Sequence, residues 1–410
     1  MRAARNRHAG IVSIGLGSML SVLAGVPVAA QSGEGDRVVR AEFHVTTQLD
    51  WRRFPSPAGP STDSFEVPRA RVGIKGALFH HVEYEVERDF RKTNAPWRDV
   101  YLNVPLRRAF EVKAGRFKIP FSLDQLTGSA DLDFAYRSLA ATYLAPGRDV
   151  GVMAHGRAFG RRVRYQAGAF RQGGDNVRSA ERLDPHSSGA LAGRVAIKPW
   201  NDSGTSGALR GLSLAAAVTA GHVPEGRYSV RGHTIADVAF FPSVYVRGLR
   251  RRYGGEIDWR AGPVAMRSEL IQVVDQRLGQ GTSDAALPDI VAQGWYVSGT
   301  WLLTGEKKAD EIRPAQPFLQ GGAGAIEVAA RLEDLRFGSR HTNRPGSQGP
   351  RAEALVTQAD RVWTFGLNWY LNRFVKAQAN VVREWREEAG VPMPGRPRAW
   401  SPVVRLQFHL

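Results

Sequence analysis

Large apolar side chains alternate with small or polar ones in the stretch WTFGLNWYLN, residues 363–372. In an extended strand, successive side chains point to opposite faces, so this stretch has one apolar, aromatic face and one polar face. The segment PVVRLQFHL, residues 402–410, alternates in the same way and places Val404, Leu406 and Phe408 on one face. Both stretches predict amphipathic strands that separate two different environments.

Similar β-rich runs recur along nearly the whole chain, and no helical stripe of three or more turns interrupts them. They predict about sixteen strands. Their approximate spans are 39–49, 69–79, 82–90, 98–104, 110–117, 148–156, 162–170, 190–198, 211–219, 248–260, 263–274, 292–303, 324–337, 360–371, 374–386 and 401–410.

The connections between these runs tend to alternate in length. Short links at residues 80–81, 261–262 and 372–373 fall at every second junction, whereas the other links are long, polar and rich in glycine and proline. Short turns at one end and long loops at the other are typical of an outer-membrane barrel. The link 304–323 is an exception, because it is long where a short turn is due. The pattern predicts an all-β fold, one closed transmembrane antiparallel β-barrel with both termini on the periplasmic side.

The first thirty residues have the pattern of a secretory signal peptide. Three arginines precede a short apolar segment, residues 11–26, and the small residues of PVAAQS offer a cleavage site after Ala30. A membrane anchor is the alternative, but the apolar segment is short and rich in glycine and serine. The sequence therefore predicts an exported bacterial protein, with a signal peptide over residues 1–30 and a single barrel domain over residues 31–410.

The export signal helps to decide whether the apolar face of each strand meets lipid or a protein core. In an outer-membrane barrel, the apolar face meets lipid and the polar face meets a water-filled lumen. A soluble β-sandwich or barrel with the apolar face in its core is the alternative. The signal peptide, the loop lengths and the final amphipathic strand favour the membrane barrel, because an open sheet edge is not stable in lipid. Barrels of this class usually end in an aromatic residue, and Leu410 departs from that pattern.

Composition excludes several kinds of site. The chain has no cysteine, so it has no disulfide framework, thiol nucleophile or cysteine-based metal site. Its ten histidines do not fall at metal-ligand spacing, and no nucleotide-binding or hydrolase motif is present. The mean hydropathy of -0.30 does not distinguish a soluble protein from a membrane barrel, because amphipathic strands average to a hydrophilic value. We therefore expect no catalytic residue, no metal and no cofactor.

The chain is strongly basic, with a formal net charge of +17, or about +14 without the three arginines of the signal peptide. In an exported protein this charge does not indicate nucleic-acid binding. Arginine or lysine in a lumen raises the local concentration of anions and repels cations. Arginine also suits phosphate, whose oxygens accept its bidentate fork. The charge predicts passage of small inorganic or organic anions.

The alternation also predicts which basic residues point into the lumen. Arg69, Arg71 and Lys75 project from one strand to the same side, and we expect them to contact permeant anions. The acidic face of the next strand, residues 83–89, requires cationic partners. A structural ion pair is therefore the alternative for each inward cation. The other basic residues that the alternation points inward are Lys113, Arg164, Arg194, Lys198, Arg252, Arg260, Arg331, Lys376 and Arg405.

Six blocks of the sequence carry a family resemblance. In chain order they are RARVGIKGALFHHVEYEVERDF, VKAGRFKIPFSLDQLTGSADLDF, YRSLAATYLAPGRDVGVMAHG, GWYVSGTWLLTGE, AIEVAARLEDL and TFGLNWYLNRFVKAQANVV. Through them the chain resembles the phosphate-selective porin O and P family over about residues 65–410. The resemblance implies a sixteen-stranded outer-membrane barrel, a homotrimer surrounded by lipid and lipopolysaccharide, and passive diffusion of anions, with phosphate or polyphosphate as candidate substrates.

By the same resemblance, the long segment 118–147 folds into the barrel and forms its constriction. Phosphate-selective relatives place a lysine and serines early in this segment. Here the lysine position is Gln125, and Ser129 retains a hydroxyl group. Lys118, Arg137 and Arg148 are basic counterweights to the aspartates of the segment. A general or organic-anion porin of the same fold is therefore an alternative, and an outer-membrane enzyme or adhesin is a third.

Overall fold

The computed structural model describes most of the chain after the predicted signal peptide. The described residues are 39–54, 62–79, 81–92, 96–107, 109–172, 189–200, 207–339, 351–352, 355–388, 391–392 and 400–410. The predicted signal peptide, residues 1–30, and part of the predicted short link at residues 80–81 lie outside them.

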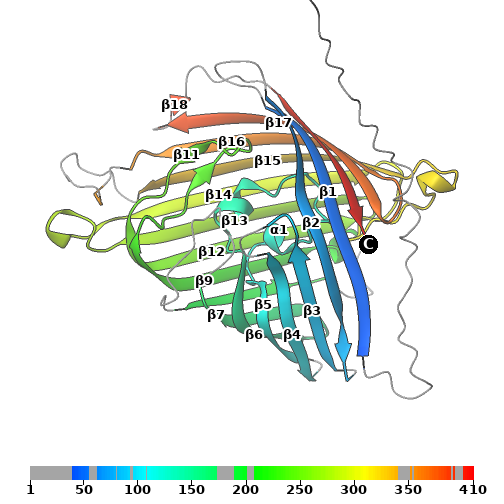
Figure 1. The fold of residues 1–410 in the computed structure, drawn as a ribbon, viewed down its shortest axis with the longest axis horizontal. Coiled ribbons are helices and arrows are strands. Elements are labelled where there is room, and N and C mark those ends of the chain that lie inside the picture. The colour runs from blue at the N-terminus through cyan, green and yellow to red at the C-terminus, as the bar shows by residue number, and fades with distance from the viewer. Residues whose placement is uncertain are drawn as a thin grey trace, which may run out of the picture. The chain divides into compact units, whose positions relative to one another are not determined.

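Sixteen strands of the described residues form one closed antiparallel β-barrel, as the sequence predicts (Figure 1). Each strand pairs with its neighbours in chain order, and β1 closes the barrel by pairing with both β2 and β19. Each of the sixteen predicted spans overlaps one of these strands. They are β1 (Val39–Phe54), β2 (Thr62–Leu78), β3 (Val82–Asp89), β4 (Trp97–Arg107), β5 (Phe110–Lys118), β6 (Arg148–Ala158), β7 (Val163–Phe170), β8 (Ala190–Ile197), β9 (Ser213–Gly226), β12 (Val246–Ala261), β13 (Val264–Arg277), β14 (Leu287–Leu302), β15 (Ala325–Ser339), β16 (Gln358–Tyr370), β17 (Val375–Glu388) and β19 (Ser401–His409).

The remaining elements are short. β10 (Gly232–His233) and β11 (Ala239–Phe241) pair with each other, and β18 (Val391–Pro392) pairs with the end of β17. The helices of the described residues are α1 (Leu123–Leu126), α2 (Leu139–Tyr143), α3 (Gly207–Arg210), η2 (Thr282–Asp284) and η3 (Phe318–Gln320). Among the residues that the structure describes, no helix has the length and apolar character needed to cross a membrane.

The two faces of β16 differ as the alternation predicts. Trp363, Phe365 and Leu367 are 37%, 45% and 47% exposed on the outer face, whereas Thr364 and Asn368 between them are 2% and 0% exposed. The rings of Trp363 and Phe365 stack on each other with centroids 6.0 Å apart. The outer face of this strand is therefore an aromatic and aliphatic surface suited to lipid.

Tight turns gather at one end of the barrel. The turn between β12 and β13 has two residues, Gly262 and Pro263, and Gly262 adopts a φ of +58°, where a side chain would be strained. The segment 303–324 between β14 and β15 lies at this end and is long, as predicted. The segment 198–212 between β8 and β9 is a second long connection there, which the sequence pattern did not single out.

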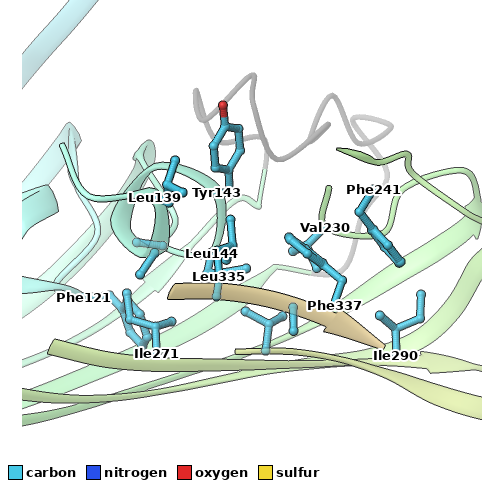
Figure 2. Close-up of a cluster of buried hydrophobic side chains, with 14 of the residues drawn as sticks. Phe121, Leu139, Tyr143, Leu144, Val230, Phe241, Ile271, Ile290, Leu335 and Phe337 are labelled. Atoms are coloured by element: carbon cyan, nitrogen blue, oxygen red, sulfur yellow. The ribbon is translucent and has the colours of Figure 1, made fainter. Parts of the chain in front are cut away.

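A hydrophobic cluster fills part of the barrel interior (Figure 2). Inner faces of adjacent strands contribute Ile271, Ile290, Leu335 and Phe337, and each is at most 1% exposed. Phe121 and Leu144 of the segment 119–147 and Val230 of the segment 227–245 belong to the same cluster and lie against them from inside the barrel. The expectation of a polar, wet inner face is therefore wrong on this wall. The reason is that two inward-folded segments exclude water from it, so apolar side chains are stable there.

Candidate functional site

The segment 119–147, between β5 and β6, folds into the barrel as the family resemblance implies, and we call it the constriction loop (Figure 1). Ser122 caps α1, because its side chain accepts a hydrogen bond from the Gln125 amide at 3.2 Å. The Ser122 hydroxyl in turn donates to Glu269 on β13 at 2.6 Å, and the Asp124 amide donates to the same carboxylate at 3.0 Å. The barrel wall therefore fixes the start of the loop.

Polar side chains of β16 and β17 hold the middle of the constriction loop through its backbone. Asn368 on β16 donates to the Asp133 carbonyl at 2.9 Å, and Gln378 on β17 donates to the Leu132 carbonyl at 3.1 Å. The Lys376 ammonium donates to the same Leu132 carbonyl at 3.0 Å. Asn368 points inward, as the alternation predicts, but it is covered by the loop and does not meet water.

A buried charge network holds the same part of the loop from the tight-turn end. The Asp133 carboxylate lies 2.5 Å from Lys308 Nζ and 3.3 Å from Arg267 Nη1. Lys308 belongs to the long segment 303–324, is 7% exposed and also contacts Glu327. Burial alone would raise the pKa of Asp133, but the cations of Lys308 and Arg267 outweigh it and hold the pKa well below its ordinary value. The unusual long connection thus reaches inside to bind the constriction loop.

The segment 227–245, which carries β10 and β11, is a second inward-folded segment. Its Val230 amide donates to Asp275 at 3.2 Å, and its Ile235 amide donates to Glu384 at 2.6 Å. Phe241 stacks on Phe337 of β15 with ring centroids 4.6 Å apart. It also meets the constriction loop, because His233 stacks on Tyr143 at 5.8 Å. The two segments together narrow the lumen on the β13–β17 side.

A cavity of about 320 Å³ lies beside the constriction loop, against the wall of β1, β2, β4 and β19. Its lining is strongly cationic, because eight basic side chains face two acidic ones, Glu66 and Asp89. Pro68 of β2 and neutral side chains of the constriction loop and of the segment 227–245 complete the lining. The basic residues are Arg52, Arg69, Arg71, Arg91, Lys92, Arg98, Arg137 and Arg405.

The three cations expected to contact anions have different surroundings. Arg69 lines the cavity and donates to the Gln48 side chain, and it forms no salt bridge with any described residue. Arg71 also lines the cavity, but it pairs with Asp89 at 3.0 Å and donates to Ser129 at 3.2 Å. Lys75 is exposed further along β2 and does not line the cavity. Of the three, Arg69 is therefore the one that lines the cavity without a described carboxylate partner.

The cations next to the constriction loop are engaged with protein groups. Lys118 donates to the carbonyls of Leu126 and Thr127, both at 2.9 Å, and so ties the loop to β5. Arg148 pairs with Asp99, with its Nε 2.8 Å from the carboxylate. Both side chains position the loop or its base.

The other cations predicted to point inward, apart from Arg405, lie outside the cavity, and four of them were expected to contact anions. Arg194 pairs with Glu256 at 2.9 Å, and the Lys113 ammonium lies 3.9 Å from the centroid of the Tyr101 ring. Arg164 and Lys198 are exposed near the tight-turn end of β7 and β8. The structure does not bring these four together with Arg69.

Gln125 and Ser129, singled out by the resemblance, do lie near Arg69 and Arg71. Gln125 is in α1 and lines the cavity. Ser129 accepts hydrogen bonds from Arg71 through its hydroxyl and from Gln48 through its carbonyl.

Sequence reasoning missed part of the cavity. Arg405 was predicted to face inward but not to share a site with Arg69, because only barrel closure brings β19 near β2. Arg98 carried no signal beyond its charge. Tyr136 lies in an irregular loop, where strand alternation gives no direction. Arg137 in the same loop was expected only as a counterweight to its aspartates, not as part of a shared cavity.

One group of side chains has the chemistry of a metal site. His44, Glu85 and Glu87 place potential ligand atoms within 4.8 Å of one another on β1 and β3. The guanidinium of Arg71 lies 3.6 Å from the Glu87 carboxylate and already supplies positive charge there. We therefore treat this group as part of the lumen ion-pair network.

The comparisons with known proteins agree with this architecture. No curated protein matches the chain. A family model for the phosphate-selective porin O and P family matches residues 42–408. The chain belongs to this family. As a member of a porin family with a closed sixteen-stranded barrel, it is an outer-membrane porin, and its family and fold are those of a channel.

Solved structures of other porins have a similar fold. The outer membrane channel DcaP of Acinetobacter baumannii is 11% identical, with a TM-score of 0.56, and the match covers 93% of this chain and 100% of that chain. An anion-selective porin from Comamonas acidovorans is 14% identical, with a TM-score of 0.53 over 91% of this porin and 100% of that one. OmpT of Vibrio cholerae is 11% identical, with a TM-score of 0.54, and the match covers 93% of this chain and 100% of that chain. At these identities the likeness shows the fold alone.

Proposed function

We propose that this porin passes small anions across the outer membrane by passive diffusion and that the basic cavity is its selective region. The observation that carries the proposal is the lining of that cavity, with eight basic side chains against two acidic ones. Such a lining attracts anions and repels cations, and low-dielectric walls strengthen the effect. Phosphate and organic anions are both candidate substrates.

The experiment is a reversal-potential measurement on the purified protein in planar bilayers under a potassium chloride gradient. We expect the reversal potential to have the sign that an anion-selective pore gives. Arg69→Ala should lower the chloride-to-potassium permeability ratio, because Arg69 has no carboxylate partner that its removal would expose. Arg313→Ala is the control, because Arg313 is an exposed side chain of the segment 303–324 that pairs with Glu311. A cation-selective or unselective wild-type pore would contradict the proposal.

The finer features of the protein also belong to this proposal. Residues 1–30 act as a signal peptide, residues 31–410 form the mature barrel domain, and the tight-turn end faces the periplasm. The n-region, apolar segment and cleavage site support export. Mass spectrometry of the protein purified from outer membranes should give a chain that begins at Gln31.

Assembly as a homotrimer in lipid and lipopolysaccharide completes the proposal. The aromatic outer face of β16 supports contact with lipid. OmpT of Vibrio cholerae has a solved trimer form, and the resemblance to the family extends that state to this porin as an expectation. Cross-linking in native membranes should give a band at three times the monomer mass.

A further inference from the structure

The outer wall of the barrel carries arginines among tryptophans on the neighbouring strands β15, β16 and β17, toward the end opposite the tight turns (Figure 1). On β16, Arg361 lies two positions before Trp363 and is directly opposite Trp385 of β17. Arg383 of β17 is directly opposite Trp363. Because directly paired residues of an antiparallel sheet share one face, all four side chains are on the outer face. The apolar band of β16 therefore ends at arginines on this side.

Two of the arginines on this outer face are neutralised by carboxylates. Arg336 Nε lies 2.7 Å from Asp334, and Arg361 Nη2 lies 3.2 Å from the same carboxylate. Asp334 belongs to the outward side of β15 but is only 2% exposed, because the two guanidinium groups cover it. The second carboxylate, Glu387, lies 3.9 Å from Arg336. Two carboxylates thus balance Arg336 and Arg361, and the charge of Arg383 is left over.

Arg383 forms no salt bridge with any residue that the structure describes. Its guanidinium lies over the rings of Trp385 and Trp400, at 5.0 and 5.3 Å from their centroids, and its Nε has no hydrogen-bond partner. The Trp400 ring is also 6.0 Å from Phe365, which belongs to the lipid-facing surface. A cation on the lipid face of a barrel is destabilising, increasingly so with depth. Arg383 therefore lacks a counter-charge at a place where one would stabilise the barrel.

The phosphate group of a lipid has the chemistry that this place requires. A cationic ligand would be repelled, and a neutral headgroup would leave the charge of Arg383 uncompensated. A guanidinium group presents paired N–H donors that match two phosphate oxygens. Tryptophan rings favour the headgroup level of a membrane, which is also the level of the lipid phosphates. With the tight-turn end on the periplasmic side, the cluster lies in the outer leaflet, where the lipid A of lipopolysaccharide carries phosphate.

We infer that Arg383, held between Trp385 and Trp400, binds a phosphate group of the lipid A of lipopolysaccharide on the outer wall of the barrel. Arg361 is 42% exposed beside it and supplies further N–H donors at the rim. The acyl chains then lie along the apolar stripe of β16 that includes Phe365. The inference rests on the orientation given in the proposed function and adds a ligand site outside the lumen.

The test measures lipid binding to the purified protein in detergent by native mass spectrometry. The probes are phosphorylated lipid A and the same lipid A with its phosphates removed. Arg383→Gln should raise the half-saturating concentration of phosphorylated lipid A by roughly tenfold, as expected for loss of a charge-assisted contact. Arg383→Lys keeps the charge without the fork and should give a smaller increase. The dephosphorylated probe should bind more weakly to the wild type and should not distinguish the variants.

Arg373→Gln is the matched control. Arg373 is exposed in the tight turn between β16 and β17, and its guanidinium lies 4.3 Å from the centroid of the Phe374 ring. It is thus another arginine over an aromatic ring, but at the opposite end of the same strands. This variant should bind phosphorylated lipid A like the wild type. Heat-resistant migration in detergent checks that each variant has assembled before its binding is compared.

Three outcomes overturn the inference. The first is unchanged binding of phosphorylated lipid A to Arg383→Gln, or equal binding of the dephosphorylated probe to the wild type. The second is equally tight, Arg383-dependent binding of phosphatidylglycerol, which would assign the site to anionic phospholipids in general. The third is cross-linking of Trp385→Cys to a second protomer in native membranes, which would show that another copy covers this face. A reversal potential without anion preference overturns the proposed function instead and leaves lipid binding unchanged.

Discussion

Most charge at the scale of single side chains is compensated locally within the lumen. Arg250 pairs with Asp275 at 2.5 Å, and Arg405 pairs with Asp50 at 2.7 Å, with all four side chains at most 1% exposed. Breaking one such pair would leave a buried charge without a partner, which typically costs about 3–5 kcal/mol. The net charge of the chain therefore overstates the charge that a permeant ion meets. Arg69 matters because it lacks such a pair.

The outer face gives the first prediction. Phe365 is 45% exposed near the middle of β16 and contacts Trp363 and Trp400. Phe365→Arg would place a charge in the apolar band and should lower the free energy of unfolding by roughly 2–4 kcal/mol in lipid, the usual cost near the midplane of the bilayer. Urea titration in lipid vesicles measures this loss. Phe365→Leu is the control and should lose much less, and equal stability of the two variants would show that this face does not meet lipid.

At the scale of elements, the two inward-folded segments are held by different forces. The middle of the constriction loop is held by polar and charged groups, through Asn368, Gln378 and Lys308, whereas its two ends also pack in the hydrophobic cluster. The segment 227–245 is held largely by aromatic packing on Phe337. Hydrogen bonds and ion pairs fix direction more sharply than apolar contact does. The constriction loop is therefore the better-defined edge of the pore.

The second prediction concerns Lys308. Lys308→Met keeps most of the side-chain volume but leaves Glu327 without its ammonium partner and Asp133 with Arg267 alone. Loss of a buried partner should cost about 3–5 kcal/mol and loosen the middle of the constriction loop. Single-channel recordings should show larger current fluctuations. Lys307→Met is the matched control, because Lys307 is the exposed neighbour of Lys308. If the ion pair positions the loop, Lys308→Arg should keep the current fluctuations as small as in the wild type.

The same network predicts a response to acid. The pKa of Asp133 is lower in the folded protein than the value of about 3.9 of an unfolded chain. A depressed pKa stabilises the fold above the unfolded value, and this stabilisation is lost as the pH falls toward the folded pKa. Current fluctuations should therefore stay constant from pH 7 to about pH 4 and increase below it. Asp133→Asn should remove this step, and an unchanged acid response in that variant would assign it to another group.

The sequence predicted the strands far better than the cavity, for a physical reason. Alternation along a strand depends only on which face meets lipid, so Trp363 and Thr364 could be assigned from their neighbours alone. The partners of an inward residue depend on strand register and closure. Arg71 was correctly predicted to face inward, but its pairing with Asp89 depends on β3, and the contact of Lys308 with Asp133 joins two irregular segments. Neither segment carries a periodic signal.

The whole molecule adds a long-range field to these local contacts. The cavity lining is cationic, whereas the outer face of β16 is apolar. The electrostatic field of these charges therefore acts on ions in the lumen. Anion preference should fall as salt rises, because the Debye length falls from about 10 Å at 0.1 M to about 3 Å at 1 M. Reversal potentials measured at the same tenfold gradient and increasing mean concentration test this prediction. A constant permeability ratio would assign selectivity to direct contacts instead of the field.

The pairing of β1 with β19 has a consequence for the order of events during biogenesis. Closure brings Thr46 and His409 within 2.8 Å, although they are 363 positions apart in the chain. Contacts between such distant residues form late, because joining them costs more loop entropy than forming a hairpin between neighbouring strands. Until that moment, two strand edges offer unpaired amides and carbonyls to any other chain. We therefore expect the slow and aggregation-prone stage of folding to be the one before β19 pairs with β1.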